Sequence, residues 1–143
     1  MQSAERLLTE QKNLRKNRKY LFYAIPTPSK SKHTVWECGF PGPDTDIYKD
    51  SYFTVHLIFD TKYPINPPSV KFIDPVYHPN VYTGGNVCLD IISSRWKPSM
   101  NVMSVLNGLQ HLLENPNIKS PANVPAGQLF RKDRSKYEYL SER

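Results

Sequence analysis

Five prolines fall within the nineteen residues from Lys62 to Asn80, and they restrict what this part of the chain can form. Proline has no backbone N–H to donate and breaks the interior of a helix, so neither a helix nor a central strand runs through "KYPINPPSVKFIDPVYHPN". We predict a stiff, extended layer here, with Val70 and Phe72 in a short edge strand. Longer regular elements are therefore expected on either side of this segment.

Three runs rich in aromatic and β-branched residues precede the prolines and are typical of an antiparallel meander. They are "YLFYAIP", "TVWECGF" and "SYFTVHLIF", which begin at Tyr20, Thr34 and Ser51. Alternate positions of the third run are apolar, as in a sheet with one face on the core: Phe53, Val55, Leu57 and Phe59. With the edge strand, these runs predict a four-stranded antiparallel sheet.

Helical spacing is found at both ends of the chain. Residues 3 to about 17 are predicted to form an amphipathic helix capped by Ser3, with Ala4, Leu7, Leu8, Gln11 and Leu14 on the face that packs. A buried central helix is expected after Asn101, which is its predicted cap, and a last helix from about Val124 to Leu140. This order of elements predicts an α+β domain with helices on one face of the sheet.

The length of 143 residues fits one domain, residues 1–143, with a sizeable core. No apolar run approaches the roughly 20 residues of a membrane span, and the start "MQSAERLLTEQ" does not resemble a secretory signal. We therefore expect a soluble intracellular protein whose Cys38 and Cys88 are reduced, with a disulfide between them as the alternative.

The net charge of +6 favours an acidic partner. Six basic residues crowd the first nineteen positions: Arg6, Lys12, Arg15, Lys16, Arg18 and Lys19. Nucleic acid is one such partner, but no aromatic and basic interleaving, zinc-ligand spacing or RNA-binding motif accompanies the basic residues. A docking face for an acidic protein is the other reading.

Cys88 ends the loop "HPNVYTGGNVC", and several interpretations of this thiol compete. A free cysteine is often only a small buried residue. A hydrolytic nucleophile needs a histidine base with an orienting group, and no histidine here carries such a signature; His78 with Pro79 is expected to tie down the loop. A thiol that carries an acyl group to an amine instead needs an oxyanion donor, for which Asn80 is the candidate. Gly84 and Gly85 would let the chain turn back and bring Asn80 near Cys88.

The ordered set "YPINPP", "HPN", a cysteine eight residues after that asparagine, and "CLDIISSRWKPSMNVMSVLNGLQHLL" resembles the ubiquitin-conjugating enzyme family over nearly the whole chain. The resemblance implies the fold of that family: an N-terminal helix, a four-stranded antiparallel sheet, an active-site loop, and then central and C-terminal helices. It also implies an acyltransferase that takes an activated ubiquitin-like protein onto Cys88 as a thioester and passes it to a substrate lysine. Asn80 would stabilise the oxyanion or hold the active-site loop.

Four stretches are similar to the SUMO-conjugating member of the family: "AIPT", "WECGFPG", "HPNVYTGGNVCL" and "NPNIKSPA". This resemblance implies that SUMO is the modifier. It further implies that Lys12, Arg15 and Lys16 contact the activating enzyme and SUMO, and that Tyr82, Lys71, Pro121 and Ala122 contact the substrate. Solvated surface charge is the alternative for the three basic residues.

The chain departs from the family pattern at several positions. Ser120 replaces an aspartate that orients the incoming lysine and favours its neutral form, so a hydroxyl without charge stands at that catalytic position. Gly127 and Ser69 replace groove residues of the SUMO-conjugating member, and the Cys88 to Trp96 spacing is two residues shorter, equal to the ubiquitin type. The short Cys88 to Trp96 spacing keeps a carrier of ubiquitin, or of another modifier, as the rival interpretation.

The sequence thus predicts a SUMO-conjugating enzyme. A ubiquitin carrier and a non-catalytic modifier-binding variant are the alternatives within the fold, and a nucleic-acid binder is the alternative outside it. We expect no metal, and the resemblance implies no cofactor, because the activating enzyme of such a pathway uses the ATP. The expected partners are the modifier, the activating enzyme, ligases and substrate proteins, in the nucleus and cytoplasm, with no membrane partner.

Overall fold

A computed structural model describes residues 2–16, 21–29 and 31–142, without the side chains of Gln2, Arg15 and Lys16. The chain begins with helix α1 (Gln2–Lys16) and continues into strands β1 (Tyr23–Thr27), β2 (Thr34–Pro41), β3 (Tyr52–Phe59) and β4 (Ser69–Phe72). A short 3-10 helix, η2 (Asp90–Ile92), precedes helices α2 (Val102–Glu114), α3 (Val124–Lys132) and α4 (Arg134–Ser141). The predicted α+β order is confirmed.

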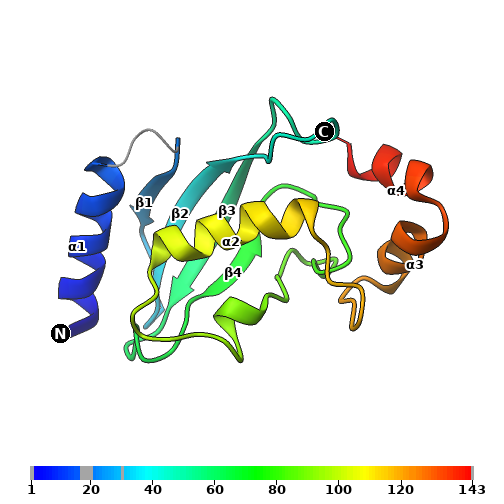
Figure 1. Cartoon of the computed structure of the whole chain (residues 1–143). Coiled ribbons are helices and arrows are strands. Elements are labelled where there is room, and N and C mark those ends of the chain that lie inside the picture. Colours follow the sequence, from blue (N-terminus) through cyan, green and yellow to red (C-terminus); the bar gives the residue numbers. More distant parts are fainter. Residues whose placement is uncertain (1, 17–20, 30, 143) are drawn as a thin grey trace.

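The four strands form one antiparallel sheet in the order β1-β2-β3-β4, and the predicted edge strand is β4. The apolar positions of β3 are all buried, as the alternation predicts, because successive side chains of a strand point to opposite faces. Helix α2 lies across that face (Figure 1), and its apolar residues are buried against it: Val102, Val105, Leu106, Leu109, Leu112 and Leu113. The core lies between this helix and the sheet.

Asn101 caps α2 as predicted. Its side chain accepts a hydrogen bond from the Ser104 backbone nitrogen at 2.9 Å, and the Ser104 hydroxyl accepts one from the Asn101 backbone. This reciprocal pair satisfies donors that a helix start would otherwise leave unpaired.

Helix α1 differs from its prediction. Ser3 lies inside the helix, and its hydroxyl donates to the carbonyl oxygens of Thr61 and Tyr63 instead of capping the first turn. Leu7 and Leu14 are buried, but Leu8 and Ala4 are exposed because the helix packs at the β1 end of the sheet through a narrower face (Figure 1).

A buried carboxylate completes that packing face. Glu10 accepts hydrogen bonds from the Tyr63 hydroxyl and the Val102 backbone nitrogen, each at 2.6 Å, and from Arg6 at 2.9 Å. Burial, followed by this carboxylate, raises the pKa of Tyr63. Because a buried carboxylate needs several donors, α1 is joined firmly to the start of α2 and to the proline-rich layer.

The predicted last helix is two helices. The chain breaks at Asp133, whose backbone is not helical and whose side chain accepts a hydrogen bond from the Lys136 backbone nitrogen to cap α4. Of the helices, α2 crosses the core face of the sheet, while α1 lies beside β1 and α3 and α4 lie beyond the C-terminal end of α2 (Figure 1).

Candidate active site

The loop that carries Cys88 is a short β-like hairpin. The Cys88 backbone nitrogen donates to the Asn80 carbonyl oxygen at 2.9 Å, the Tyr82 nitrogen donates to the Asn86 oxygen at 2.9 Å, and Val81 pairs with Val87. The hairpin continues the sheet, because the Phe72 nitrogen donates to the Gly85 oxygen at 2.8 Å. Asn80 and Cys88 are therefore neighbours across this hairpin, as the two-glycine turn predicts.

The two glycines of this turn have different constraints. Gly85 has a φ of +98°, and a Cβ atom there would lie 2.5 Å from the Phe72 carbonyl oxygen. Only glycine fits such a position without strain. A Cβ atom at Gly84 would meet nothing within 4 Å, so Gly84 leaves open space beside the hairpin.

The Asn80 side chain is buried and joins a second loop. Its amide nitrogen donates to the Asn117 carbonyl oxygen, and its amide oxygen accepts from the Asn117 backbone nitrogen, both at 2.8 Å. The Asn123 nitrogen also donates to the Pro79 oxygen at 2.9 Å. These three bonds hold residues 117–123 beside the hairpin. The Asn80 side chain therefore holds the second loop in place.

His78 is buried beneath the hairpin. Its Nδ1 accepts a hydrogen bond from the Asn80 backbone nitrogen at 3.0 Å, so its Nε2 carries the proton that is donated to the Leu112 carbonyl oxygen at 2.8 Å. Burial lowers the pKa of His78 to about 4, although the backbone carbonyls of Leu112 and Leu113 oppose the shift. A neutral imidazole with both nitrogens bonded ties the loop to α2, and neither nitrogen is free to deprotonate Cys88.

The two thiols differ in access. Both cysteines are free, as expected; Cys38 is buried in β2 and Cys88 is exposed. Burial, and then Glu37, raises the pKa of Cys38 above the usual range of a thiol, so it is a poor nucleophile. In the part of the chain that the structure describes, the Cys88 sulfur has no hydrogen-bond or ion-pair partner. Cys88 is the thiol that a reactant can approach.

The second loop places the remaining predicted residues beside this hairpin. Ser120 is exposed, while Pro121 and Ala122 are half-buried. A Cβ atom at Gly127 would lie 3.0 Å from the Pro121 Cβ and 4.0 Å from the Pro79 Cβ, so this glycine lets α3 pack tightly against both loops. The sequence marked Gly127 only as a departure from the family pattern and did not single out Asn117, whose partner lies 37 positions away.

Two of the residues assigned to the substrate lie on the hairpin and on the strand that adjoins it. Tyr82 is 50% exposed within it. Lys71 is exposed on β4, where it pairs with Asn86 of the hairpin. Both side chains are accessible near the loop that holds Cys88.

The basic residues of α1 lie apart from this site, on another element. Lys12 is exposed, but Arg6 is committed to Glu10 and to the Met100 carbonyl oxygen. The side chains of Arg15 and Lys16, and all of Arg18 and Lys19, lie outside the described residues. In the described ranges no cluster of three or more histidine, cysteine or acidic side chains has the geometry of a metal site, and no helix is long and apolar enough to cross a bilayer.

The exposed Cys88 thiol lies on a hairpin beside a second loop, and both nitrogens of the nearby His78 are already bonded. Because a hydrolytic cysteine needs a free base beside it, this geometry favours a thiol that carries an acyl group over the nucleophile of a hydrolase. Comparison with known proteins agrees. The family model described as "Ubiquitin-conjugating enzyme" matches residues 6–143, and the chain belongs to the ubiquitin-conjugating enzyme family.

Individual relatives support the same family. The chain is 48% identical over 102 residues to ubiquitin-conjugating enzyme E2 2 of Debaryomyces hansenii, covering 71% of this chain and 61% of that protein. It is 42% identical over 111 residues to ubiquitin-conjugating enzyme E2 1 of Caenorhabditis elegans, covering 78% and 58%. It is 40% identical over 132 residues to ubiquitin-conjugating enzyme E2 2 of Saccharomyces cerevisiae, covering 92% and 76%. The match thus spans about three fifths of the length of the first two relatives.

The prediction of a SUMO-conjugating enzyme is wrong. These three relatives are named ubiquitin-conjugating enzymes, and their names do not mention SUMO. The sequence features that agree with these relatives are the ubiquitin-type spacing from Cys88 to Trp96 and the departures from the SUMO-conjugating member at Ser69 and Gly127.

Proposed function

We propose that this chain is a ubiquitin carrier, which accepts ubiquitin as a thioester on Cys88 and transfers it to the amino groups of lysine side chains. The observation that carries the proposal is the exposed Cys88 on the hairpin, in a chain whose other cysteine is buried. Family membership and the names of the relatives support ubiquitin as the modifier. Residues 1–143 would form the catalytic core as a single domain.

In the loading step, the Cys88 thiolate attacks the carbonyl carbon of the thioester between ubiquitin and the activating enzyme. A new carbon–sulfur bond forms, the old one breaks, and the leaving thiolate takes up a proton. The activating enzyme consumes ATP before this exchange, so this chain needs no cofactor of its own. The exposed Lys12, with Arg15 and Lys16, is assigned to docking that enzyme.

In the transfer step, the neutral amine of a lysine attacks the same carbonyl carbon. A carbon–nitrogen bond forms, the Cys88 thiolate leaves, and the nitrogen loses a proton to solvent. Asn80 holds the second loop beside the thiol, and an oxyanion contact requires its amide to give up a bond to Asn117. Ser120 offers the amine a hydroxyl acceptor, without the charge of an aspartate.

The substrate side of the site is assigned to four residues. Tyr82 and Lys71 lie accessible on the hairpin and the adjoining strand, and Pro121 with Ala122 follows Ser120 in the second loop. We further propose that the chain acts with ligases and on substrate proteins in the nucleus and cytoplasm.

A charging assay tests the proposal. The protein is incubated with ATP and either the ubiquitin activating enzyme with ubiquitin or the SUMO activating enzyme with SUMO, and gels are run with and without reductant. We expect a reductant-sensitive adduct with ubiquitin and none with SUMO. No adduct in either tube would favour the non-catalytic alternative.

Substitution of the two cysteines locates the adduct. Cys88→Ser is expected to give a reductant-resistant oxyester or no adduct, because an oxygen ester resists thiol exchange. Cys38→Ala is the matched control and should still load. Unchanged thioester formation by Cys88→Ser would overturn the assignment of the nucleophile.

A further inference from the structure

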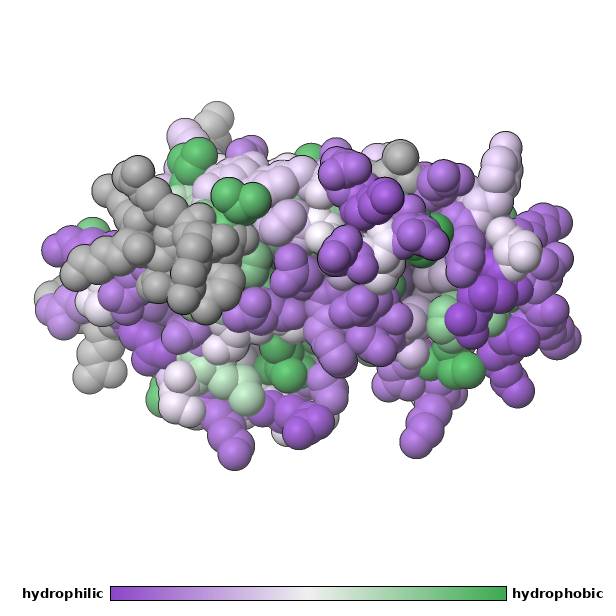
Figure 2. Space-filling model, turned by 45° about the horizontal axis from the view of Figure 1, so that its top comes forward, coloured by the Kyte–Doolittle hydropathy of each residue, from purple (hydrophilic) through white to green (hydrophobic). Residues whose placement is uncertain are grey.

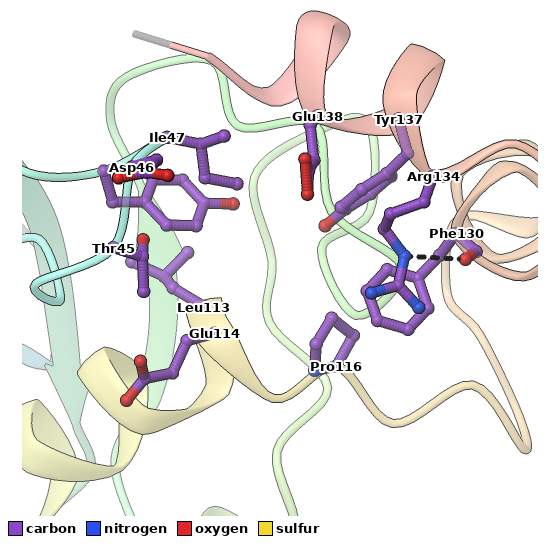
Figure 3. A pocket seen from close by; sticks show the side chains of 11 residues that line it. Thr45, Asp46, Ile47, Leu113, Glu114, Pro116, Phe130, Arg134, Tyr137 and Glu138 are labelled. Carbon is purple, nitrogen blue, oxygen red and sulfur yellow. Dashed lines mark hydrogen bonds between the residues drawn. The ribbon is translucent and has the colours of Figure 1, made fainter.

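A hollow of about 230 Å³ lies between the segment after β2, the C-terminal end of α2, and helices α3 and α4 (Figure 3). Its walls include Ile47, Tyr48 and Leu113 on one side and Phe130 and Tyr137 on the other. Pockets for drug-sized ligands are typically roughly 300 to 1,000 Å³. This hollow therefore suits a single long side chain better than a whole small molecule.

A second, more open hollow of about 410 Å³ adjoins the first. It is lined by Gly42 to Asp44 and by the exposed face of α2, and the two hollows share Glu114. Together they form a groove, which we call the α2 groove, between α2 and residues 42–48. The face of the molecule drawn in Figure 2 is mostly hydrophilic, and its apolar residues lie in small separate groups.

The α2 groove is acidic, although the whole chain carries a net charge of +6. Four carboxylates line it: Asp44, Asp46, Glu114 and Glu138. The ion pairs found in the described residues are Arg6–Glu10 and Arg95–Asp90, so none of these four carboxylates forms an ion pair with another described residue. Four carboxylates that line one groove of a basic protein concentrate negative potential there.

Arg134, the one arginine that lines the groove in the described part of the chain, is engaged elsewhere. Its guanidinium carbon lies 3.5 Å from the centroid of the Phe130 ring, and its Nε donates to the Phe130 carbonyl oxygen at 2.9 Å (Figure 3). The Arg134 side chain thus lines the wall of the hollow and is held away from the carboxylates.

A buried hydroxyl faces the hollow independently of this charge. Tyr137 is 2% exposed, and its hydroxyl points into the space below α4 in Figure 3. The side chains of Tyr48 and Ser141 lie near that oxygen, but in the described part of the chain it makes no hydrogen bond of ordinary geometry. A buried polar group without a partner has a free-energy cost that a ligand donor relieves. A phenol oxygen between aromatic rings, with carboxylates at the rim, suits an ammonium or guanidinium group.

We propose that the α2 groove binds a basic, extended segment of a partner protein, with one arginine or lysine side chain inserted between Tyr137 and the carboxylates of Asp46 and Glu138. The segment then continues along the second hollow past Glu114 and Asp44. The site is separate from the hairpin of Cys88 and does not depend on the function proposed for that thiol. Glu114 nevertheless lies three residues before Asn117, at the end of the loop that Asn80 holds.

The test is a titration of the isotope-labelled protein with the peptide GRGKGRGKG, followed by NMR. We expect saturable shifts confined to residues 42–48, 107–116 and 130–138, weakening as salt is added because exposed charges are screened. The acidic peptide GEGDGEGDG should cause none of these shifts. Shifts that are absent, or that are spread evenly over the surface, would overturn the proposal.

Variants separate the groove from general charge. Asp46→Asn with Glu138→Gln should weaken binding of the basic peptide about twofold to fivefold per carboxylate, the range for exposed ion pairs. Glu5→Gln with Asp90→Asn removes the same charge outside the groove and should leave the affinity unchanged. An equal loss in both pairs would show non-specific attraction and refute the site.

Tyr137→Phe tests the buried hydroxyl. We expect the affinity to fall about twofold to tenfold, because one hydrogen bond to the ligand is lost. The thermal stability of the free protein should stay the same or rise, since an unpaired buried hydroxyl is removed. Unchanged affinity in a folded Tyr137→Phe protein would exclude insertion of a basic side chain beside this ring.

Discussion

Asn80 illustrates how one residue joins two segments of the site. Its buried amide makes two part-buried hydrogen bonds to the backbone of Asn117. Asn80→Ala should lower the free energy of unfolding by about 1 to 3 kcal/mol, because both groups of Asn117 lose their partners. Urea unfolding of the variant and the parent protein measures this loss.

The same substitution should slow transfer to lysine more than loading of Cys88. Transfer requires both loops in place and a stabilised oxyanion, whereas the sulfur stays exposed in either case. Single-turnover loading and discharge to free lysine give the two rates. Equal slowing of both steps would argue against an oxyanion role specific to lysine attack.

Ser120 stands where the family resemblance places an aspartate. Ser120→Asp is expected to raise the rate of discharge to free lysine severalfold, because a carboxylate orients the approaching ammonium or amine better than a hydroxyl does. Discharge of the preformed thioester is measured with lysine in excess. Ser120→Ala is the control, and a rate for Ser120→Asp no higher than that of Ser120→Ala would remove Ser120 from the site.

At the scale of the element, the hairpin depends on one glycine of its pair. Gly85→Ala should destabilise the protein by about 1 to 3 kcal/mol, because alanine is strained at a φ of +98° and its Cβ meets the Phe72 carbonyl. Gly84→Ala meets no atom and should be neutral within about 0.5 kcal/mol. Thermal unfolding compares the two, and similar losses would mean that the turn adopts another conformation.

The sequence predicted some helices and strands better than others. The alternation in β3 and the apolar spacing of α2 predicted their buried residues, because one long face of each element is in contact with the core. The break at Asp133 was missed, since an aspartate in a helical pattern becomes a cap only when the chain has room to turn there. Leu8 was assigned to the apolar face, but the end of a sheet offers α1 less surface than its central face does.

At the scale of the whole molecule, His78 makes stability depend on pH. Burial holds its pKa near 4, whereas an unfolded histidine titrates near 6.5, so the unfolded chain takes up the proton first as the pH falls. The contribution of the neutral His78 to the free energy of unfolding is therefore fully present above about pH 6.5. It should decrease by up to about 3 kcal/mol as the pH falls towards 4. Urea unfolding at a series of pH values between these limits measures the slope.

Substitution of the histidine separates its part of that slope. His78→Gln should be less stable at neutral pH, because the ring joins the hairpin to Leu112, but its stability should change less between pH 6.5 and 5. A His78→Gln slope equal to that of the parent would assign the acid sensitivity to other groups.

The sequence by itself determined the α+β order, the register of the core-facing residues and the identity of the one loop suited to a thiol carrier. Periodicity, proline and glycine act locally, so these features are visible along the chain. The tertiary structure alone decided that the Asn80 amide is held by Asn117, that Cys38 is buried while Cys88 is open, and that four carboxylates meet in one groove. Such contacts join segments far apart in the sequence, and their partners are chosen by how the core packs.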